Sequence, residues 1–214
     1  VFAGGSRCRA GGRAPLGYKL KHTATGAIRN SVAVKKSTLV VDPGPAAQVK
    51  AFLKGRAAGL PRNEAAKRAG CDCVQLFTKN NNQWAGKPIT GEDAARFKES
   101  LANLGIGHPI AHNSYLINLA TPNQDFHNKS TKALIDEIQR AEQVRIPDVV
   151  LHPGSPVDGS PEYGMKKIIE SLNLCIEKTK DARARISLEL TAGQGSHLGY
   201  TFEQIAEMIF GVEN

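Results

Sequence analysis

The stretch KSTKALIDEIQRAEQVRIPDVVLHPGS, residues 129–155, decides the fold because it contains a helix followed directly by a buried strand. Residues 129–144 carry apolar side chains three and four positions apart, which is the spacing of one helical face. That face consists of Leu134, Ile135, Ile138 and Ala141. The run PDVVLHPGS (147–155) is short, apolar and closed by a Pro-Gly turn, as is typical of a buried strand.

The same alternation of strand and helix recurs along most of the chain. We predict strands within 71–77, 108–117, 147–155 and 185–190, and helices over 91–105, 129–144, 163–179 and 201–212. A further strand is expected at VKAFL, residues 49–53, ahead of a short helix that contains Leu60 and Ala65. Alternating elements of this length predict an α/β fold with a parallel sheet. We interpret it as a partial TIM (β/α) barrel, with about five of the usual eight strands.

The N-terminal region differs from the rest in charge. Residues 1–58 hold eleven Lys and Arg residues and one acidic residue, so this region accounts for the net charge of +8. We therefore interpret residues 1–48 as a basic irregular leader and residues 49–214 as the barrel domain. The leader has three possible origins, namely a disordered segment, a gene-model artefact or an organelle transit peptide. A short strand is expected within it at Ser37–Val41.

Composition limits the cellular setting. No apolar run approaches the roughly 18 residues of a membrane-spanning helix, so no membrane partner is expected. Four cysteines in a chain of this length do not form a disulfide framework, which favours a reducing compartment and a cytoplasmic protein. We interpret Cys71 and Cys73 as small apolar residues on one face of a strand, not as metal ligands.

Three predicted strands end in a potential metal ligand. PIAH ends at His112, VVLH ends at His152 and ISLE ends at Glu189. Because the carboxyl ends of parallel barrel strands form one rim, we expect these three side chains to lie close together. Two imidazoles and a carboxylate are a common ligand set for zinc or another divalent cation. The sequence therefore predicts a metal site.

The residues around these ligands resemble the endonuclease IV family of apurinic/apyrimidinic (AP) endonucleases. The similar motifs are QLFTKNNNQW (75–84), AHNSYLINLA (111–120), LHPGS (151–155) and LELTAGQGSHLG (188–199). They occur in the family's order within residues 59–214. The resemblance implies a zinc-dependent DNA-repair hydrolase. Such an enzyme cleaves duplex DNA on the 5′ side of an abasic site and leaves a 3′-hydroxyl.

The resemblance also implies roles for individual residues. His112 and His152 are similar to two ligands of one zinc ion. Glu189 is similar to the carboxylate that bridges this ion to a second one, and it is the candidate catalytic residue. Tyr115 and Leu116 are similar to residues that enter the DNA at the lesion. Asn82 stands where some members insert an arginine into the DNA. The predicted DNA-binding residues are therefore Tyr115, Leu116 and Asn82.

The sequence departs from the family pattern at both ends. The opening motif with a histidine is replaced by LKGRAAGL, residues 53–60. Later motifs that complete the family's three zinc sites do not occur up to Asn214, so ligands for one ion are visible. We therefore expect this chain to be an inactive fragment of a monomeric enzyme. Two alternatives remain open, a metal-dependent sugar-isomerase-like barrel and a non-catalytic remnant.

Overall fold

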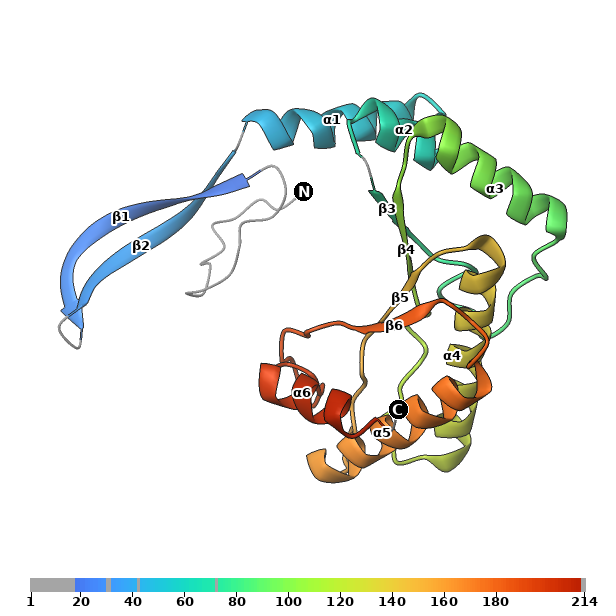
Figure 1. Ribbon diagram of the computed structural model, residues 1–214. Helices are drawn as coiled ribbons and strands as arrows, with labels where there is room; N and C mark the ends of the chain where they lie inside the picture. The colour runs from blue at the N-terminus through green and yellow to red at the C-terminus, as the bar shows by residue number, and fades with distance from the viewer. Residues whose placement is uncertain (1–17, 30–31, 42, 72, 213–214) are drawn as a thin grey trace. The chain divides into compact units, whose positions relative to one another are not determined.

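The computed structural model describes residues 18–29, 32–41, 43–71 and 73–212, and these form parts of two compact units. Unit 1 covers Val1–Cys71 and unit 2 covers Asp72–Asn214. Figure 1 shows the helices and strands of each unit. Among the described residues, no helix combines the length and the apolar character that crossing a bilayer demands.

Unit 1 contains a β-hairpin and two helices. Strands β1 (Tyr18–Arg29) and β2 (Val32–Val41) pair antiparallel, and helices α1 (Pro43–Ala57) and α2 (Arg62–Arg68) follow. The predicted strand at Ser37–Val41 is part of β2. The irregular leader is a wrong prediction for residues 18–48, since the hairpin and the start of α1 occupy most of them. Residues 1–17 lie outside the described part of the chain.

The predicted strand at residues 49–53 is also wrong, because these residues lie inside α1. Periodicity cannot separate a strand from a helix in so short an apolar run. Pro43 opens the helix at a position where its missing N–H costs nothing. The described part of the chain therefore contributes four parallel strands, not five, to the barrel-like sheet.

Unit 2 is a run of four βα units. Its elements are β3 (Cys73–Leu76), α3 (Gly91–Leu104), β4 (His108–His112), α4 (Gln124–Val144), β5 (Asp148–Leu151), α5 (Pro161–Lys178), β6 (Arg185–Leu188) and α6 (Phe202–Phe210). The strands are parallel and lie in sequence order, β3-β4-β5-β6. This arrangement confirms the predicted α/β fold as part of a TIM barrel. Cys73 begins β3 and is exposed, and Cys71 lies outside this strand, so the predicted placement of both cysteines on one strand face is wrong.

Side-chain caps fix where the helices of unit 2 begin. Thr90, Asn123, Ser160 and Thr201 each accept a hydrogen bond from a backbone N–H in the first turn of the helix that follows. Such caps satisfy amide groups that have no partner inside the helix. The left-handed residue Gly105 ends α3, as its position in the sequence predicts. The caps set the lengths of the loops between strands and helices.

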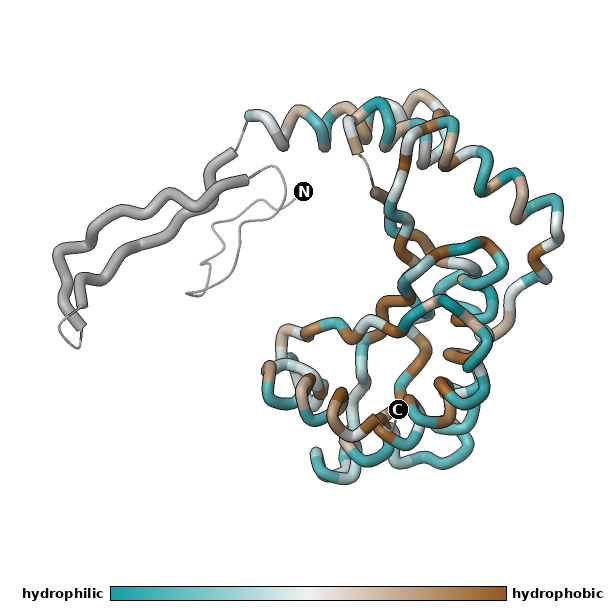
Figure 2. Tube along the Cα trace, in the orientation of Figure 1, coloured by the Kyte–Doolittle hydropathy of each residue, from teal (hydrophilic) through white to brown (hydrophobic). Residues whose placement is uncertain are grey.

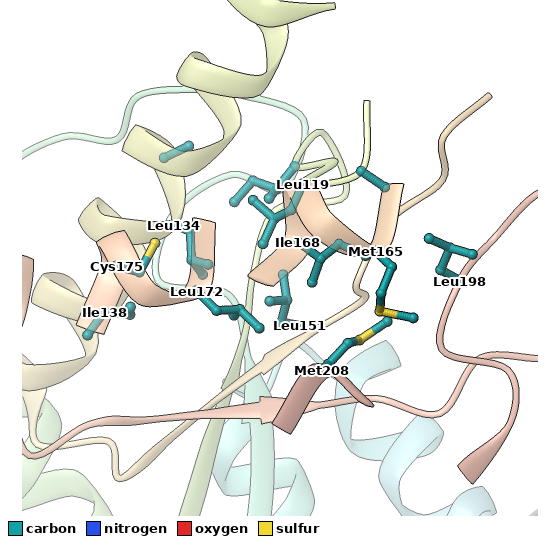
Figure 3. Close-up of a cluster of buried hydrophobic side chains, with 13 residues drawn as sticks. Leu119, Leu134, Ile138, Leu151, Met165, Ile168, Leu172, Cys175, Leu198 and Met208 are labelled. Carbon is teal, nitrogen blue, oxygen red and sulfur yellow. The ribbon is translucent and has the colours of Figure 1, made fainter. Parts of the chain in front are cut away.

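The main core of unit 2 lies between the sheet and the helices α4, α5 and α6. Leu134, Leu151, Ile168 and Met208 are fully buried within it, as Figure 3 shows. In Figure 2, hydrophobic residues are frequent along the strands of unit 2, while hydrophobic and hydrophilic residues alternate along its helices. Burial of each large aliphatic side chain stabilises the fold by about 1.5–3 kcal/mol. Leu151 directly precedes His152, so the core also anchors the end of β5.

Candidate metal centre

The carboxyl ends of β4, β5 and β6 bring the three predicted ligands together. His112 is the last residue of β4, and His152 and Glu189 directly follow β5 and β6. One ligand atom from each side chain lies within 4.8 Å of the others. His112 pairs with Val150 across the sheet, and Leu151 pairs with Leu188, so the register aligns the three strand ends. The predicted rim therefore exists in unit 2.

The carboxylate of Glu189 lies between the two imidazole rings. Its Oε2 atom is 3.2 Å from Nε2 of His112 and 3.5 Å from Nε2 of His152. The His112 side chain is 3% exposed, whereas the side chains of His152 and Glu189 are 39% and 43% exposed. The site is thus closed on the side of β4 and open to solvent on the side of β6.

The hydrogen bond of His112 determines its tautomer. Nδ1 lies 2.8 Å from the backbone oxygen of Asn113, which can only accept a hydrogen bond. Nδ1 therefore carries the proton, and in the neutral ring Nε2 presents a lone pair to the Glu189 carboxylate. A backbone carbonyl that orients a histidine through its second nitrogen is common around protein-bound metals.

The converging acceptor atoms fit a metal ion. Nε2 of His112 and Oε2 of Glu189 would repel each other unless a proton or a cation lies between them. A metal ion placed among them can bind all three atoms at once. Zinc bonds of about 2.0–2.2 Å in tetrahedral geometry separate neighbouring ligand atoms by about 3.3–3.5 Å. The two separations from Oε2 of Glu189, 3.2 and 3.5 Å, lie near this range, and all three ligand atoms lie within 4.8 Å of one another.

An aromatic cluster borders the three ligands. The exposed ring of Tyr115 lies 5.3 Å from the His112 ring and 6.3 Å from the His152 ring, measured between centroids. Phe77 supports Tyr115 from the loop after β3, with an edge-to-face contact at 5.4 Å. Sequence reasoning assigned no role to Phe77, although it lies in the motif at residues 75–84 and at the end of a predicted strand.

The two other predicted DNA-binding residues lie beside the cluster. Leu116 is half-buried, and its N–H donates to the Ser114 hydroxyl at 3.3 Å. Asn82 is exposed in the loop after β3, where its N–H donates to the Asn80 side chain at 2.9 Å. This loop is tied to the loop after β4, because the Ser114 hydroxyl donates to the backbone oxygen of Asn81 at 2.7 Å. Tyr115, Leu116 and Asn82 therefore belong to two connected loops.

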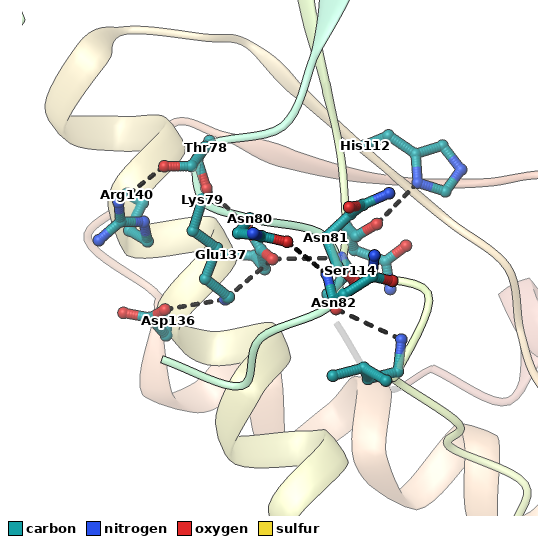
Figure 4. A network of polar contacts seen from close by, with 12 residues as sticks. Thr78, Lys79, Asn80, Asn81, Asn82, His112, Ser114, Asp136, Glu137 and Arg140 are labelled. Atoms are coloured by element: carbon teal, nitrogen blue, oxygen red, sulfur yellow. Dashed lines mark hydrogen bonds and ion pairs between the residues drawn. The ribbon is translucent and has the colours of Figure 1, made fainter. Parts of the chain in front are cut away.

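Sequence reasoning also missed a buried polar network below these loops (Figure 4). Glu137 of α4 is 2% exposed and accepts hydrogen bonds from the Thr78 hydroxyl at 2.6 Å and the Ser114 N–H at 3.2 Å. It also forms an ion pair with Lys79 at 2.8 Å. Arg140, one helical turn later, donates to the backbone oxygen of Thr78 at 2.7 Å. The signal was a carboxylate on the apolar face of a predicted helix.

Asn118 connects the loops that follow β4 and β5. Its Oδ1 atom accepts from the N–H groups of Ala120 at 3.0 Å and Ser155 at 2.9 Å, and its amide donates to the Ser155 backbone oxygen at 2.8 Å. Gly154 packs directly against this amide. The Gly154 backbone oxygen accepts from the N–H of Leu198 at 2.8 Å, which joins the loop after β6. The loops of three successive strands are thus linked around the candidate site.

Comparison with protein families gives a match that covers the whole of unit 2. A family model described as xylose isomerase-like TIM barrel matches residues 64–214. This range includes His112, His152 and Glu189.

Comparison with individual proteins gives similar sequences in several bacteria. A probable endonuclease 4 of Trichlorobacter lovleyi is 42% identical over 156 residues, which is 72% of this chain and 56% of that protein. A probable endonuclease 4 of Geotalea daltonii is 43% identical over 148 residues, which is 69% of this chain and 52% of that protein. The chain thus spans about half the length of these relatives.

Solved structures with the same fold include proteins of two kinds. Endonuclease IV from Thermus thermophilus matches with a TM-score of 0.55 and 25% identity, over 77% of this chain and 55% of that one. A D-psicose 3-epimerase matches with a TM-score of 0.59 and 15% identity, over 72% of this chain and 54% of that one. The likeness to the epimerase concerns the fold alone.

Proposed function

Because this chain belongs to the xylose isomerase-like TIM barrel family and resembles its endonuclease IV members, we propose that the protein is a metal-dependent AP endonuclease. It would hydrolyse the phosphodiester on the 5′ side of an abasic site in duplex DNA and leave a 3′-hydroxyl. The observation that carries this proposal is the convergence of His112, His152 and Glu189 beside the exposed Tyr115 ring. We further expect a cytoplasmic monomer.

The three ligands would hold a divalent cation, and their nitrogen and carboxylate atoms favour zinc. When bound, zinc lowers the pKa of a coordinated water to about 7 and polarises phosphoryl oxygens. The hydrogen bond to Asn113 holds His112 in the tautomer whose Nε2 carries no proton, so this nitrogen can bind a metal without changing tautomer. Glu189 supplies a negative charge that offsets the cation, and its 43% exposure leaves room for water and a phosphate.

Tyr115 and the linked loops would select the damaged strand. An abasic site lacks a base to stack, so opening the duplex there costs less than at an intact pair. The Tyr115 ring is 60% exposed and can fill the space that the missing base leaves. Stacking of a base on an aromatic ring is worth about 1–3 kcal/mol. Leu116 and Asn82 lie on the same two connected loops and would contact the adjoining nucleotides.

A nicking assay on the full-length protein tests the proposal. The substrates are a labelled duplex with one abasic analogue and the same duplex without it. We expect cleavage of the first only, with a product that carries a 3′-hydroxyl, and loss of cleavage after chelation or in His152→Ala. Equal cleavage of both duplexes, or cleavage unchanged by these treatments, would contradict it.

The same protein should be tested for epimerisation of a ketohexose, because the fold is shared with D-psicose 3-epimerase. Sugar turnover without nicking would favour the sugar-isomerase-like alternative. The identities of 42–43% to proteins named endonuclease 4, against 15% to the epimerase, favour nicking.

A further inference from the structure

One peptide group connects the candidate metal centre with the buried network on α4. This group joins Asn113 to Ser114. Its carbonyl oxygen accepts a hydrogen bond from Nδ1 of His112 at 2.8 Å, and its N–H donates to Oε1 of Glu137 at 3.2 Å. The two hydrogen bonds therefore share one rigid, planar unit. Figure 4 shows His112 on one side of this unit and Glu137 on the other.

The shared peptide couples the two side chains physically. Any rotation of its plane moves both the acceptor that orients the imidazole ring and the donor that meets the carboxylate. A carboxylate at the N–H also polarises the amide, so the carbonyl oxygen becomes a stronger acceptor for the imidazole N–H. Both effects hold His112 with its proton on Nδ1 and its lone pair on Nε2, the form that binds a metal.

Glu137 is itself held in place by buried partners. Lys79 lies 2.8 Å from Oε1, and the Thr78 hydroxyl donates to Oε2 at 2.6 Å. The side chains of Lys79 and Glu137 are 1% and 2% exposed, so both charges have left water. A buried ion pair of this kind often contributes little net stability compared with apolar side chains of similar volume. Its contact with the His112 peptide gives it a second role.

We propose that Glu137 is a positioning residue for His112, acting through the Asn113–Ser114 peptide to fix the orientation and tautomer of the imidazole ring. The proposal deepens the proposed function and rests on it for the assignment of His112 as a metal ligand. Lys79 serves as the counter-ion that keeps the carboxylate in place. Glu137 touches neither the ligand atoms nor a substrate, so its effect on His112 is transmitted by hydrogen bonds alone.

Histidine nitrogen chemical shifts measured on the metal-free full chain give a direct test. In the native chain, the two ¹⁵N signals of His112 should report a single tautomer with the proton on Nδ1. In Glu137→Gln, which keeps the shape but removes the charge, the Nδ1 signal should move. Glu137→Leu removes the carboxylate that accepts from the Ser114 N–H. In this variant the His112 nitrogen signals should shift toward a mixture of tautomers. Asp136→Asn is the matched control, because Asp136 pairs with Lys79 at 3.0 Å from an exposed position.

Metal affinity, measured by cobalt or zinc titration of the same chains, gives a second readout. Loss of a group that orients a metal-binding histidine typically weakens binding about 10–100-fold. We expect Glu137→Leu to fall in this range. Glu137→Gln should lose less affinity than Glu137→Leu, and Asp136→Asn should retain native affinity. Should Glu137→Leu fail to fold, the charge-only variant decides. Unchanged affinity together with unchanged His112 signals in Glu137→Gln would overturn the proposal.

The variant His112→Ala separates this inference from the proposed function. If His112→Ala binds the metal as well as the native chain does, the metal centre itself is wrong. If His112→Ala loses the metal while Glu137→Gln behaves as the native chain in both measurements, the centre stands and only the positioning role is refuted.

Discussion

Replacing Gly154 with alanine should displace the loop that carries His152. Gly154 has a φ angle of +125°, a conformation that favours glycine. An added Cβ would lie 2.4 Å from Oδ1 of Asn118, which is far too close for a van der Waals contact. The Asn118 side chain would have to move away. It would then lose its hydrogen bonds to Ala120 and Ser155, which connect the loops after β4 and β5.

The cost follows from the contacts that break. Three hydrogen bonds at about 1 kcal/mol each amount to about 3 kcal/mol. The backbone strain of a non-glycine residue at this φ adds about 1–3 kcal/mol. We therefore expect Gly154→Ala to lower the free energy of unfolding by about 4–6 kcal/mol. For a chain of this size the melting temperature should fall by about 10–20 °C.

Gly195→Ala is the matched control for this substitution. Gly195 also has a positive φ, +60°, but no atom lies within 4 Å of an added Cβ. Gly195→Ala should lower the free energy of unfolding by the backbone strain alone, about 1–2 kcal/mol. Thermal unfolding followed by circular dichroism, with zinc titration of both variants, measures the difference. If Gly154→Ala melts within about 3 °C of Gly195→Ala and binds zinc equally well, the steric reasoning is refuted.

Three further predictions concern the metal, a thiol and the exposed aromatic residue. Zinc at about 100 times its dissociation constant should raise the free energy of unfolding by about 2.7 kcal/mol. The melting temperature of the native chain should therefore rise, and that of His152→Ala should not. No rise in the native chain would contradict the site. Iodoacetamide at pH 8 should label exposed Cys73 in the native chain before Cys175, as followed by mass spectrometry. Burial raises the pKa of Cys175 to about 12, so its reactive thiolate is scarce at that pH, and rapid native labelling of this thiol would show that α5 opens readily. Tyr115→Ala should weaken binding to abasic duplex about 5-fold to 150-fold while changing the stability by less than about 0.5 kcal/mol. Tyr115→Phe should bind like the native protein, and a large loss there would mean that the hydroxyl group, not the ring, makes the contact.

The convergence of His112, His152 and Glu189 was predictable because it depends on a general property of parallel sheets. Each residue ends an apolar run, and parallel strands that alternate with helices place all such ends on one edge. Neither the exact pairing of strands nor the packing of helices had to be known. The assignment of these residues as metal ligands, and of Tyr115 as a DNA contact, stays a prediction.

Glu137 and the elements of unit 1 could not be predicted from the spacing of apolar residues in the sequence. Glu137 interrupts an apolar helical face, but its partners Thr78 and Ser114 lie far from it in the sequence and share no period with it. Such a network is visible only once the loops are folded over α4. At residues 49–53 the apolar run is too short to distinguish strand from helix, and the helix that begins at Pro43 continues through it.

The sequential order of the strands β4, β5 and β6 has a consequence for how the protein is made. A chain emerges from the ribosome N-terminus first, and neighbouring units can fold while later ones are still being synthesised. All three candidate ligands lie between His112 and Glu189, each one βα unit after the last. The nascent chain therefore acquires a second nitrogen donor when β5 joins β4, and the carboxylate when β6 is added. We expect zinc capture to begin on the ribosome, which crosslinking of stalled nascent chains of increasing length can test: a site that forms only after release would rule this order out.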